Sequence, residues 1–332
     1  MCGVLPQTGF LMILTAGSES IAKAAEIIRA GGLVAIPTET VYGLGANALD
    51  PEACAKIFEA KKRPFFDPLI VHIAEYQKLD ELVTSVPDAA YKLIDRFWPG
   101  PLTLVLPRKE IIPDITTSGL DTVAIRMPSH EVARAIIRES GCPIAAPSAN
   151  PFGYLSPTTA QHVESQLGDA IDLVIDGGMC TVGVESTIVS IDADGVHLLR
   201  PGGTPREEIE KAVGKVDAKG SDGTSIKAPG MLESHYAPGA ELILVDESEA
   251  VVPSHDAAML SFRKRGYEGF RFVEVLSEKG DLKEAAVNLF AALHRLDASG
   301  VRVIYAHTVP EEGLGIAIMN RLRKASAKRI SH

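Results

Sequence analysis

Hydroxyl-bearing and glycine residues gather at 37–45, Pro-Thr-Glu-Thr-Val-Tyr-Gly-Leu-Gly, directly after an apolar run. Glycine lets a backbone approach a ligand closely, and loops that follow strands often carry binding residues. An ordinary strand-to-helix turn has the same composition, and G-x-G without a third spaced glycine is weak evidence for a nucleotide. The segment is a candidate ligand loop with that alternative open.

Basic residues lie at Lys61, Lys62 and Arg63, where a predicted helix over 52–60 ends before a proline. Cations at a helix C-terminus complement its dipole and usually point to solvent. An apolar run over 69–73 contains His72 and follows at once. A triphosphate would need Lys and Arg to converge at such a place, because its charge must be offset in a poorly screened pocket.

Two further segments put polar groups after apolar residues. Residues 122–126 alternate, so Arg126 points away from the more apolar strand face, either to the surface or onto a carboxylate or phosphate. Ser148 and Asn150 follow the apolar run 144–146, where they could cap a helix or hold a ribose or phosphate. No G-x-S-x-G elbow surrounds Ser148, so it is a poor candidate for a covalent nucleophile.

Later in the chain, Glu185 and Ser186 precede a predicted strand over 187–191, and Arg200 ends the next strand; either place could be a satisfied turn. Segment 229–238 holds His235 and Tyr236 between prolines, which would suit a lid over a pocket. The cationic end, 321–329, is predicted to be a solvated helix end.

The elements that would position these residues form an α/β pattern. Strands are expected at 33–36, 69–73, 102–106, 123–125, 144–146, 173–175 and 187–191, and helices at 20–30, 52–60, 89–97 and 131–139. Polar and glycine residues over 215–229 indicate a linker. Strands at 241–245, 257–261, 272–276 and 301–305, with a helix over 282–296, predict a small Rossmann-like domain after it.

Chain length, net charge and cysteine spacing agree with this organisation. A chain of 332 residues suggests two domains, and a net charge of -10 opposes nonspecific nucleic-acid binding while allowing a local basic pocket. Four cysteines without a C-x-x-C pair argue against a zinc ribbon and a disulfide framework. The apolar start, 9–16, is far shorter than a span of ~20 residues, so a cytoplasmic protein with no membrane partner is expected.

In combination and in order, several strings resemble the threonylcarbamoyl-AMP synthases of the YrdC-related family. They are 37–46, Lys61-x-Arg63, Trp-Pro-Gly-Pro-Leu-Thr at 98–103, Ser-Ala-Asn at 148–150, 183–187 and His-Tyr-Ala-Pro at 235–238. Residues 313–321 resemble the end of the second domain in the longer branch. The resemblance implies a YrdC-like catalytic domain with a twisted open mixed sheet at 1–214, a linker and lid at 215–239, and a Rossmann-like domain at 240–332.

The same resemblance implies a nucleotidyltransferase that makes L-threonylcarbamoyladenylate, pyrophosphate and water from L-threonine, bicarbonate and ATP. This is the first step of threonylcarbamoyl-adenosine modification of ANN-decoding tRNAs, so a tRNA threonylcarbamoyl transferase is the expected downstream partner, with at most weak RNA binding. Mg²⁺ is expected on the ATP phosphates, and no ligand cluster in the sequence requires a structural metal.

By similarity, a set of residues should bind ATP: Lys61, Arg63, Thr122, Ser148, Asn150, Ser156, Arg200 and Tyr236. A second set should hold threonine: Thr38, His72, Arg126, Ala146 and Ser186. No residue is assigned as a covalent or acid-base catalyst. The family usually has basic and aromatic residues where this chain has Leu-Glu-Ser at 232–234, which predicts a weaker lid or one that works through Tyr236 alone.

Two rival functions stay open. A carbamoyl-adenylate-forming maturation factor shares the domain but adds acylphosphatase and cysteine-rich modules, which this sequence lacks. A double-stranded RNA-binding module would use a basic face, and the acidic net charge argues against it.

Overall fold

The computed structural model describes residues 12–218, 236–249, 251–264 and 267–327. In its first part the strands are β1 (Met12–Thr15), β2 (Val34–Ile36), β3 (Gly43–Asn47), β4 (Ile70–His72), β5 (Leu102–Pro107), β6 (Thr122–Arg126), β7 (Ile144–Ala145), β8 (Leu173–Asp176), β9 (Thr187–Asp192), β10 (Gly195–Arg200) and β11 (Val216–Ala218). The α-helices of this part are α1 (Ser18–Arg29), α2 (Pro51–Lys61), α3 (Leu79–Leu82), α4 (Asp88–Phe97), α5 (Asp114–Thr117), α6 (Glu131–Ser140), α7 (Ala160–Leu167) and α8 (Arg206–Val213).

These strands form one mixed sheet in the order β1-β8-β2-β3-β7-β4-β6-β5-β9-β10-β11. The sheet combines parallel pairs, such as β4 with β6 and β5 with β9, and antiparallel pairs, such as β3 with β7 and β5 with β6. The prediction of a mixed α/β sheet domain is confirmed. The strand β11 continues this sheet to residue 218, inside the segment that the sequence predicts as linker.

Side chains alternate across the sheet and separate two hydrophobic layers. On one face, Val71, Leu104 and Ile125 pack with α2 and α4 in the largest core cluster. On the other face, β2, β7 and β8 pack against α1 and α6. Ile70 and Ala124 belong to a smaller cluster with Val105 and Ile188, and this second face carries the site described below.

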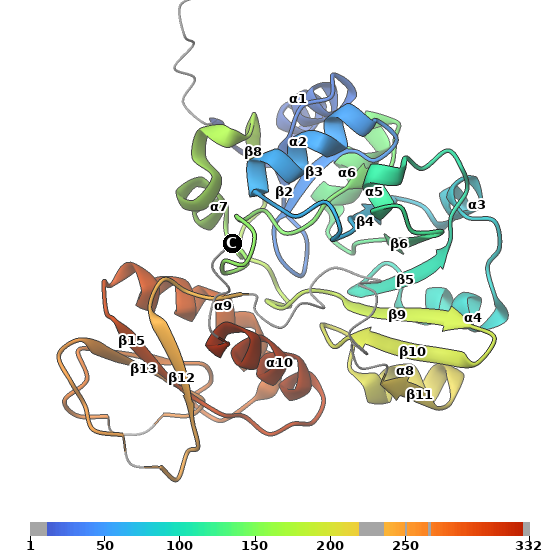
Figure 1. Ribbon diagram of the computed structural model, residues 1–332. Coiled ribbons are helices and arrows are strands. Elements are labelled where there is room, and N and C mark those ends of the chain that lie inside the picture. The colour runs from blue at the N-terminus through green and yellow to red at the C-terminus, as the bar shows by residue number, and fades with distance from the viewer. Residues whose placement is uncertain (1–11, 219–235, 250, 265–266, 328–332) are drawn as a thin grey trace, which may run out of the picture.

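The second part of the chain forms a smaller α/β domain. Its strands β12 (Glu241–Val245), β13 (Ala257–Ser261), β14 (Phe272–Val275) and β15 (Val303–His307) make a parallel sheet in the order β12-β15-β13-β14. The helices α9 (Leu282–Ala298) and α10 (Leu314–Ser326) lie between this sheet and the first domain (Figure 1). The predicted second α/β domain is therefore confirmed.

The two domains share one apolar cluster. Val41, Leu155 and Val184 of the first domain are buried with side chains of α9 and α10. Gly183 has φ +76, and a Cβ there would lie 2.3 Å from the carbonyl oxygen of Ala286 on α9. Glycine is needed here for both the backbone conformation and the close approach of the chains.

A pair of histidines also joins the domains. The rings of His162 on α7 and His294 on α9 stack with 3.9 Å between their centroids. His294 Nε2 donates to the carbonyl oxygen of Ser156 at 3.1 Å.

Among the described residues, no helix is long and apolar enough to cross a membrane. Cys54, Cys142 and Cys180, the described cysteines, are all free thiols.

Candidate functional site

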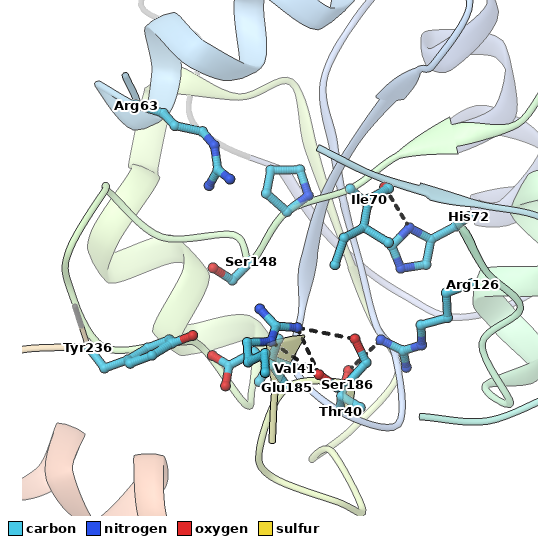
Figure 2. A pocket seen from close by; sticks show the side chains of 13 residues that line it. Thr40, Val41, Arg63, Ile70, His72, Arg126, Ser148, Glu185, Ser186 and Tyr236 are labelled. Atoms are coloured by element: carbon cyan, nitrogen blue, oxygen red, sulfur yellow. Dashed lines mark hydrogen bonds between the residues drawn. The ribbon is translucent and has the colours of Figure 1, made fainter. Parts of the chain in front are cut away.

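A pocket opens over the second face of the large sheet, where β4 and β6 run parallel. Its lining consists of Thr40, Val41, Arg63, Ile70, His72, Arg126, Ala146, Pro147, Ser148, Glu185, Ser186, Arg200 and Tyr236. Figure 2 shows Arg63 and Tyr236 on one side of it, His72 and Arg126 on the other, and Ser148 between them. Segments far apart in the sequence therefore meet at one place.

Backbone hydrogen bonds join two segments at the centre of the pocket, one around residues 42–44 and the other at 147–149. The amide of Leu44 donates to the carbonyl oxygen of Pro147 at 2.7 Å, and the amide of Ala149 donates to that of Tyr42 at 2.8 Å. These bonds fix the loop 37–42, which joins β2 to β3, against the segment that follows β7. The candidate ligand loop is thus a rigid part of the pocket wall, as binding residues require.

Arg126 ends β6 and is buried, so the alternative of a surface arginine is wrong. Its Nη2 lies 2.7 Å from Glu39 Oε1, and its Nη1 donates to Thr40 Oγ1 at 2.9 Å. Burial alone would raise the pKa of Glu39, but Arg126 lowers it below its usual value. Each terminal nitrogen of a guanidinium carries two N–H groups, so a second pair of donors can face a ligand carboxylate.

His72 lies beside Arg126, because Cα positions 72 and 126 are partners in the parallel pair. Burial, followed by the charge of Arg126, lowers the pKa of His72 to about 3. The ring is therefore neutral at pH 7, and Nδ1, 3.1 Å from the carbonyl oxygen of Ile70, is its donor nitrogen. Nε2 is then the acceptor, suited to a ligand hydroxyl or ammonium group.

Ser186 connects this side of the pocket to Arg200. Its hydroxyl lies 2.7 Å from that of Thr103 on β5. Arg200 Nη2 donates to the carbonyl oxygen of Ser186 at 2.9 Å and to its hydroxyl at 3.2 Å. The end of β10 thereby holds the residue that precedes β9.

Of the three basic residues at the C-terminal end of α2, Lys61 and Arg63 are buried, contrary to the expectation for a solvated helix end, and Lys62 is exposed as expected. Asp50 caps the N-terminus of α2, and Lys62 ends it with a left-handed φ of 51°. This turn sends Arg63 into the pocket, where it pairs with Asp67 at 2.9 Å. Burial, followed by Arg63, lowers the pKa of Lys61 well below its ordinary value.

Tyr236 closes the other side of the pocket. It is buried with a left-handed φ of 64°, which is uncommon for a residue with a Cβ and is typical of functional sites. Its ring packs 5.8 Å, centroid to centroid, from that of Phe290 on α9. The lid prediction falls mostly on residues 219–235, which include His235 and the atypical segment 232–234 and lie outside the described residues.

Eight of the predicted site residues line this pocket: Arg63, His72, Arg126, Ala146, Ser148, Ser186, Arg200 and Tyr236. Three others lie directly behind its wall. Lys61 Nζ donates to the carbonyl oxygens of Ser148 and Asn150, and Ser156 Oγ donates to Glu185 Oε1. The buried Oδ1 of Asn150 accepts no hydrogen bond from the described residues.

The two remaining predicted residues stand apart from the lining. The hydroxyl of Thr38 donates to the carbonyl oxygen of Val41 at 2.6 Å and so shapes the loop from within. Thr122 pairs with Pro107 at the opposite end of β6 from Arg126, a separation of about 13 Å along a strand.

Sequence reasoning missed Thr40, Val41, Ile70, Pro147 and Glu185 as lining residues. Thr40 and Glu185 stand inside the strings 37–46 and 183–187 that resemble the family, but no spacing rule shows which hydroxyl or carboxylate turns inward. Ile70 could have been found, because it shares a strand face with His72.

The prediction for the cationic end of the chain is wrong at Arg321. This residue of α10 is 1% exposed and pairs with Glu185 at 2.7 Å. Residues 328 and 329, the last two of that predicted segment, lie outside the described residues.

No group of three or more metal-ligating side chains exists within the described ranges. The carboxylates nearest the pocket, Glu39, Asp67 and Glu185, all pair with arginines. Because these carboxylates are paired with arginines, the site fits a magnesium ion that is held by phosphate oxygens and keeps its waters.

Comparison with known proteins places the chain in a family. Residues 26–202 match the family model Sua5_yciO_yrdC, described as telomere recombination, and residues 204–327 match the model described as threonylcarbamoyl-AMP synthase, C-terminal domain. A Pyrococcus abyssi protein named threonylcarbamoyl-AMP synthase is 49% identical over 92% of this chain and 94% of its own. The chain belongs to the threonylcarbamoyl-AMP synthase family. The predicted family and the prediction of a nucleotidyltransferase-type enzyme are confirmed.

Other members of the family agree over nearly the whole length. A Bacillus subtilis protein of the same name is 43% identical over 96% of both chains. The crystal structure of P. abyssi Sua5 complexed with L-threonine superposes with a TM-score of 0.87 at 45% identity, covering 95% of this chain and 97% of that one. The T. kodakarensis HypF structure matches 57% of this chain at 20% identity, a likeness in fold alone.

Proposed function

We propose that the protein condenses L-threonine, bicarbonate and ATP to L-threonylcarbamoyladenylate, with release of pyrophosphate and water, for threonylcarbamoyl-adenosine modification of tRNA. The pocket geometry is the main support: Arg126 and His72 form a side suited to an amino acid, and Arg63, Arg200 and Ser148 form a side suited to a nucleotide. The P. abyssi relative, which has a structure named as a complex with L-threonine, supports the first assignment.

In the proposed reaction the threonine amine attacks bicarbonate carbon, and water leaves to give a carbamate. A carbamate oxygen then attacks the α-phosphorus of ATP, and the bond to the β-phosphate oxygen breaks to expel pyrophosphate. No protein atom needs to become covalently attached. Positioning and charge stabilisation can supply most of the acceleration in such phosphorus chemistry.

Each side chain then has a defined task. Arg126, held by Glu39 and Thr40, binds the threonine carboxylate with its outward N–H groups. The neutral His72 can accept from the threonine hydroxyl or ammonium group, and Ser186 lies between the two substrates. Arg63 and Arg200 stabilise charge on the phosphates. Magnesium enters as part of the ATP substrate.

Pyrophosphate release from purified protein tests the proposal. ATP, bicarbonate and each amino acid are supplied in turn, with Mg²⁺ present. Release that depends on threonine and bicarbonate is expected, and adenylate should be detectable by mass spectrometry. Release that is absent or independent of threonine would contradict the proposal.

A gel-shift titration with duplex RNA over a range of salt concentrations distinguishes the proposed enzyme from an RNA-binding module. We expect no tight complex, because a chain with net charge -10 lacks a broad cationic surface. Tight binding that survives replacement of Arg63 and Arg200 would favour an RNA-binding module instead.

A further inference from the structure

Arg321 is the residue through which α10 of the second domain reaches the pocket of the first. Its guanidinium Nε donates to Glu185 Oε2 at 2.7 Å, and Nη1 donates to the carbonyl oxygen of Pro201 at 2.8 Å. Its Cζ also lies 5.1 Å from the centroid of the Tyr236 ring. One buried side chain therefore contacts two residues that line the pocket.

The charge of Glu185 explains why this contact is needed. Glu185 is 5% exposed and lies beside Ser186 and Arg200 on the side that we assign to the phosphates. Burial alone would raise the pKa of Glu185, but Arg321, followed by Arg200, lowers it below its usual value, so the carboxylate is ionised. An unneutralised carboxylate at this place would repel a triphosphate through a poorly screened interior.

The two carboxylate oxygens have separate partners. Oε1 accepts from Ser156 of the first domain and Oε2 from Arg321 of the second, so one group from each domain fixes the orientation of the carboxylate. Tyr236 is fixed by the same guanidinium on one face and by Phe290 of α9 near its ring. A cation over an aromatic ring is attracted to it, and the attraction strengthens where water is excluded.

We propose that Arg321 is a positioning residue for the nucleotide: it neutralises and orients Glu185 and holds Tyr236, so that the second domain sets the affinity of the first for ATP. The inference rests on the proposed function. It assigns a task in the reaction to the second domain without any substrate contact by that domain.

The test is a steady-state comparison of Arg321→Met with wild type, in which KM for ATP and KM for threonine are measured separately. We expect KM for ATP to rise by at least about tenfold, because a buried charge loses its partner, and KM for threonine to change by less than about threefold. Arg323→Met on the same helix, whose pair with Glu311 is exposed, is the matched control and should leave both constants unchanged.

A second variant separates electrostatics from folding. Adding Glu185→Gln to Arg321→Met removes the unpaired charge, and we expect KM for ATP to recover at least about threefold relative to Arg321→Met alone. Arg321→Lys keeps the charge without the planar fork and should give an intermediate KM for ATP. Arg321→Lys keeps the test open if Arg321→Met is too unstable to purify, because its KM for ATP is compared with that of wild type.

Chemical rescue gives an independent readout. Guanidinium added at a concentration well below its denaturing range should lower KM for ATP of Arg321→Ala, whereas urea at the same concentration should not. A structural role alone predicts that both KM values shift together, with no rescue. That pattern, or an unchanged KM for ATP, would overturn the inference. A wild type without threonine-dependent pyrophosphate release would instead overturn the proposed function.

Discussion

Arg126 is the residue on which threonine recognition depends in our proposal. Replacing it with lysine tests whether the planar guanidinium, with its two terminal nitrogens, is needed to bind the threonine carboxylate. Arg126→Lys should raise KM for threonine by at least about tenfold, because hydrogen bonds to charged groups contribute roughly 1.5–3 kcal/mol each. KM for ATP should change much less. Steady-state kinetics with each substrate varied in turn measures both constants.

The control for this variant is Arg138→Lys, which alters an exposed arginine on α6 that lies 3.6 Å from Glu75. It should behave like wild type. Equal increases in both KM values for Arg126→Lys would move Arg126 out of the threonine site and into a shared or structural role.

Single residues were the scale at which the sequence was least informative. It identified Arg63, Arg126 and Arg200 through local context and family resemblance, and all three line one pocket. It could not identify the direction of Glu185 or the burial of Arg321. Arg321 has the composition of a solvated helix around it, and only the packing of α10 against the first domain shows otherwise.

At the scale of elements, the segment that ends in Tyr236 supplies the closest test of the lid hypothesis. Tyr236→Ala removes a ring that packs on Phe290 and Arg321, so turnover should fall by at least about tenfold through loss of positioning. Circular dichroism and urea unfolding check that both domains stay folded. Unchanged kinetics would remove this segment from the mechanism.

Tyr236→Phe is the companion variant, since it keeps the ring and removes only the hydroxyl. Retained turnover would assign the effect to packing, and a loss equal to that of Tyr236→Ala would assign it to the hydroxyl.

The turn after β10 allows a test of whether the backbone of Glu185 and Ser186 must keep its position for activity. A Cβ at Gly202 would lie 2.3 Å from the carbonyl oxygen of Glu185 and 2.4 Å from the carbonyl carbon of Ser186. Gly202→Ala must therefore move the backbone that carries both residues, and overpacking of this kind costs about 1–3 kcal/mol. We expect lower stability and lower turnover together, measured by urea unfolding and pyrophosphate release.

Gly17→Ala serves as the control for that variant, because no atom outside its neighbours lies within 4 Å of a Cβ there. Activity and stability close to wild type are expected. A fully active Gly202→Ala would show that the Glu185 backbone can shift without consequence.

Most elements were predictable because their apolar period is clear. The predicted helix over 282–296 and strand over 257–261 correspond to α9 and β13. The strand β3 was not predicted, since Gly43-Leu-Gly-Ala-Asn47 contains residues that are depleted in strands. Pairing on both sides, with β2 and β7, overrides that weak local preference.

For the whole molecule, the buried His72 and the partly buried His162 predict a loss of stability in acid. The pKa of His162 is lowered to about 3, first by burial and then by His294, and that of His72 is also about 3. An unfolded histidine has a pKa near 6.5, so below that pH the unfolded state binds more protons. Stability should be fully present above about pH 6.5 and fall progressively toward pH 3.

Urea unfolding at a series of pH values measures this dependence. His162→Gln removes one titrating group from the contact between α7 and α9, where Arg295 also lowers the pKa of His162. Its slope of stability against pH should be smaller than that of wild type between pH 6.5 and 4. An identical slope would show that the stacked pair does not control acid sensitivity.

The backbone contact at Gly183 also determines which missense mutations the protein tolerates at this position. Every other amino acid adds at least one carbon atom at a point where the carbonyl oxygen of Ala286 would lie 2.3 Å away. Any substitution at Gly183 must therefore shift the backbone of α9 or of the segment around residue 183, and Tyr236 packs against the same helix. A substitution at a residue outside the pocket lining thereby disturbs the site itself.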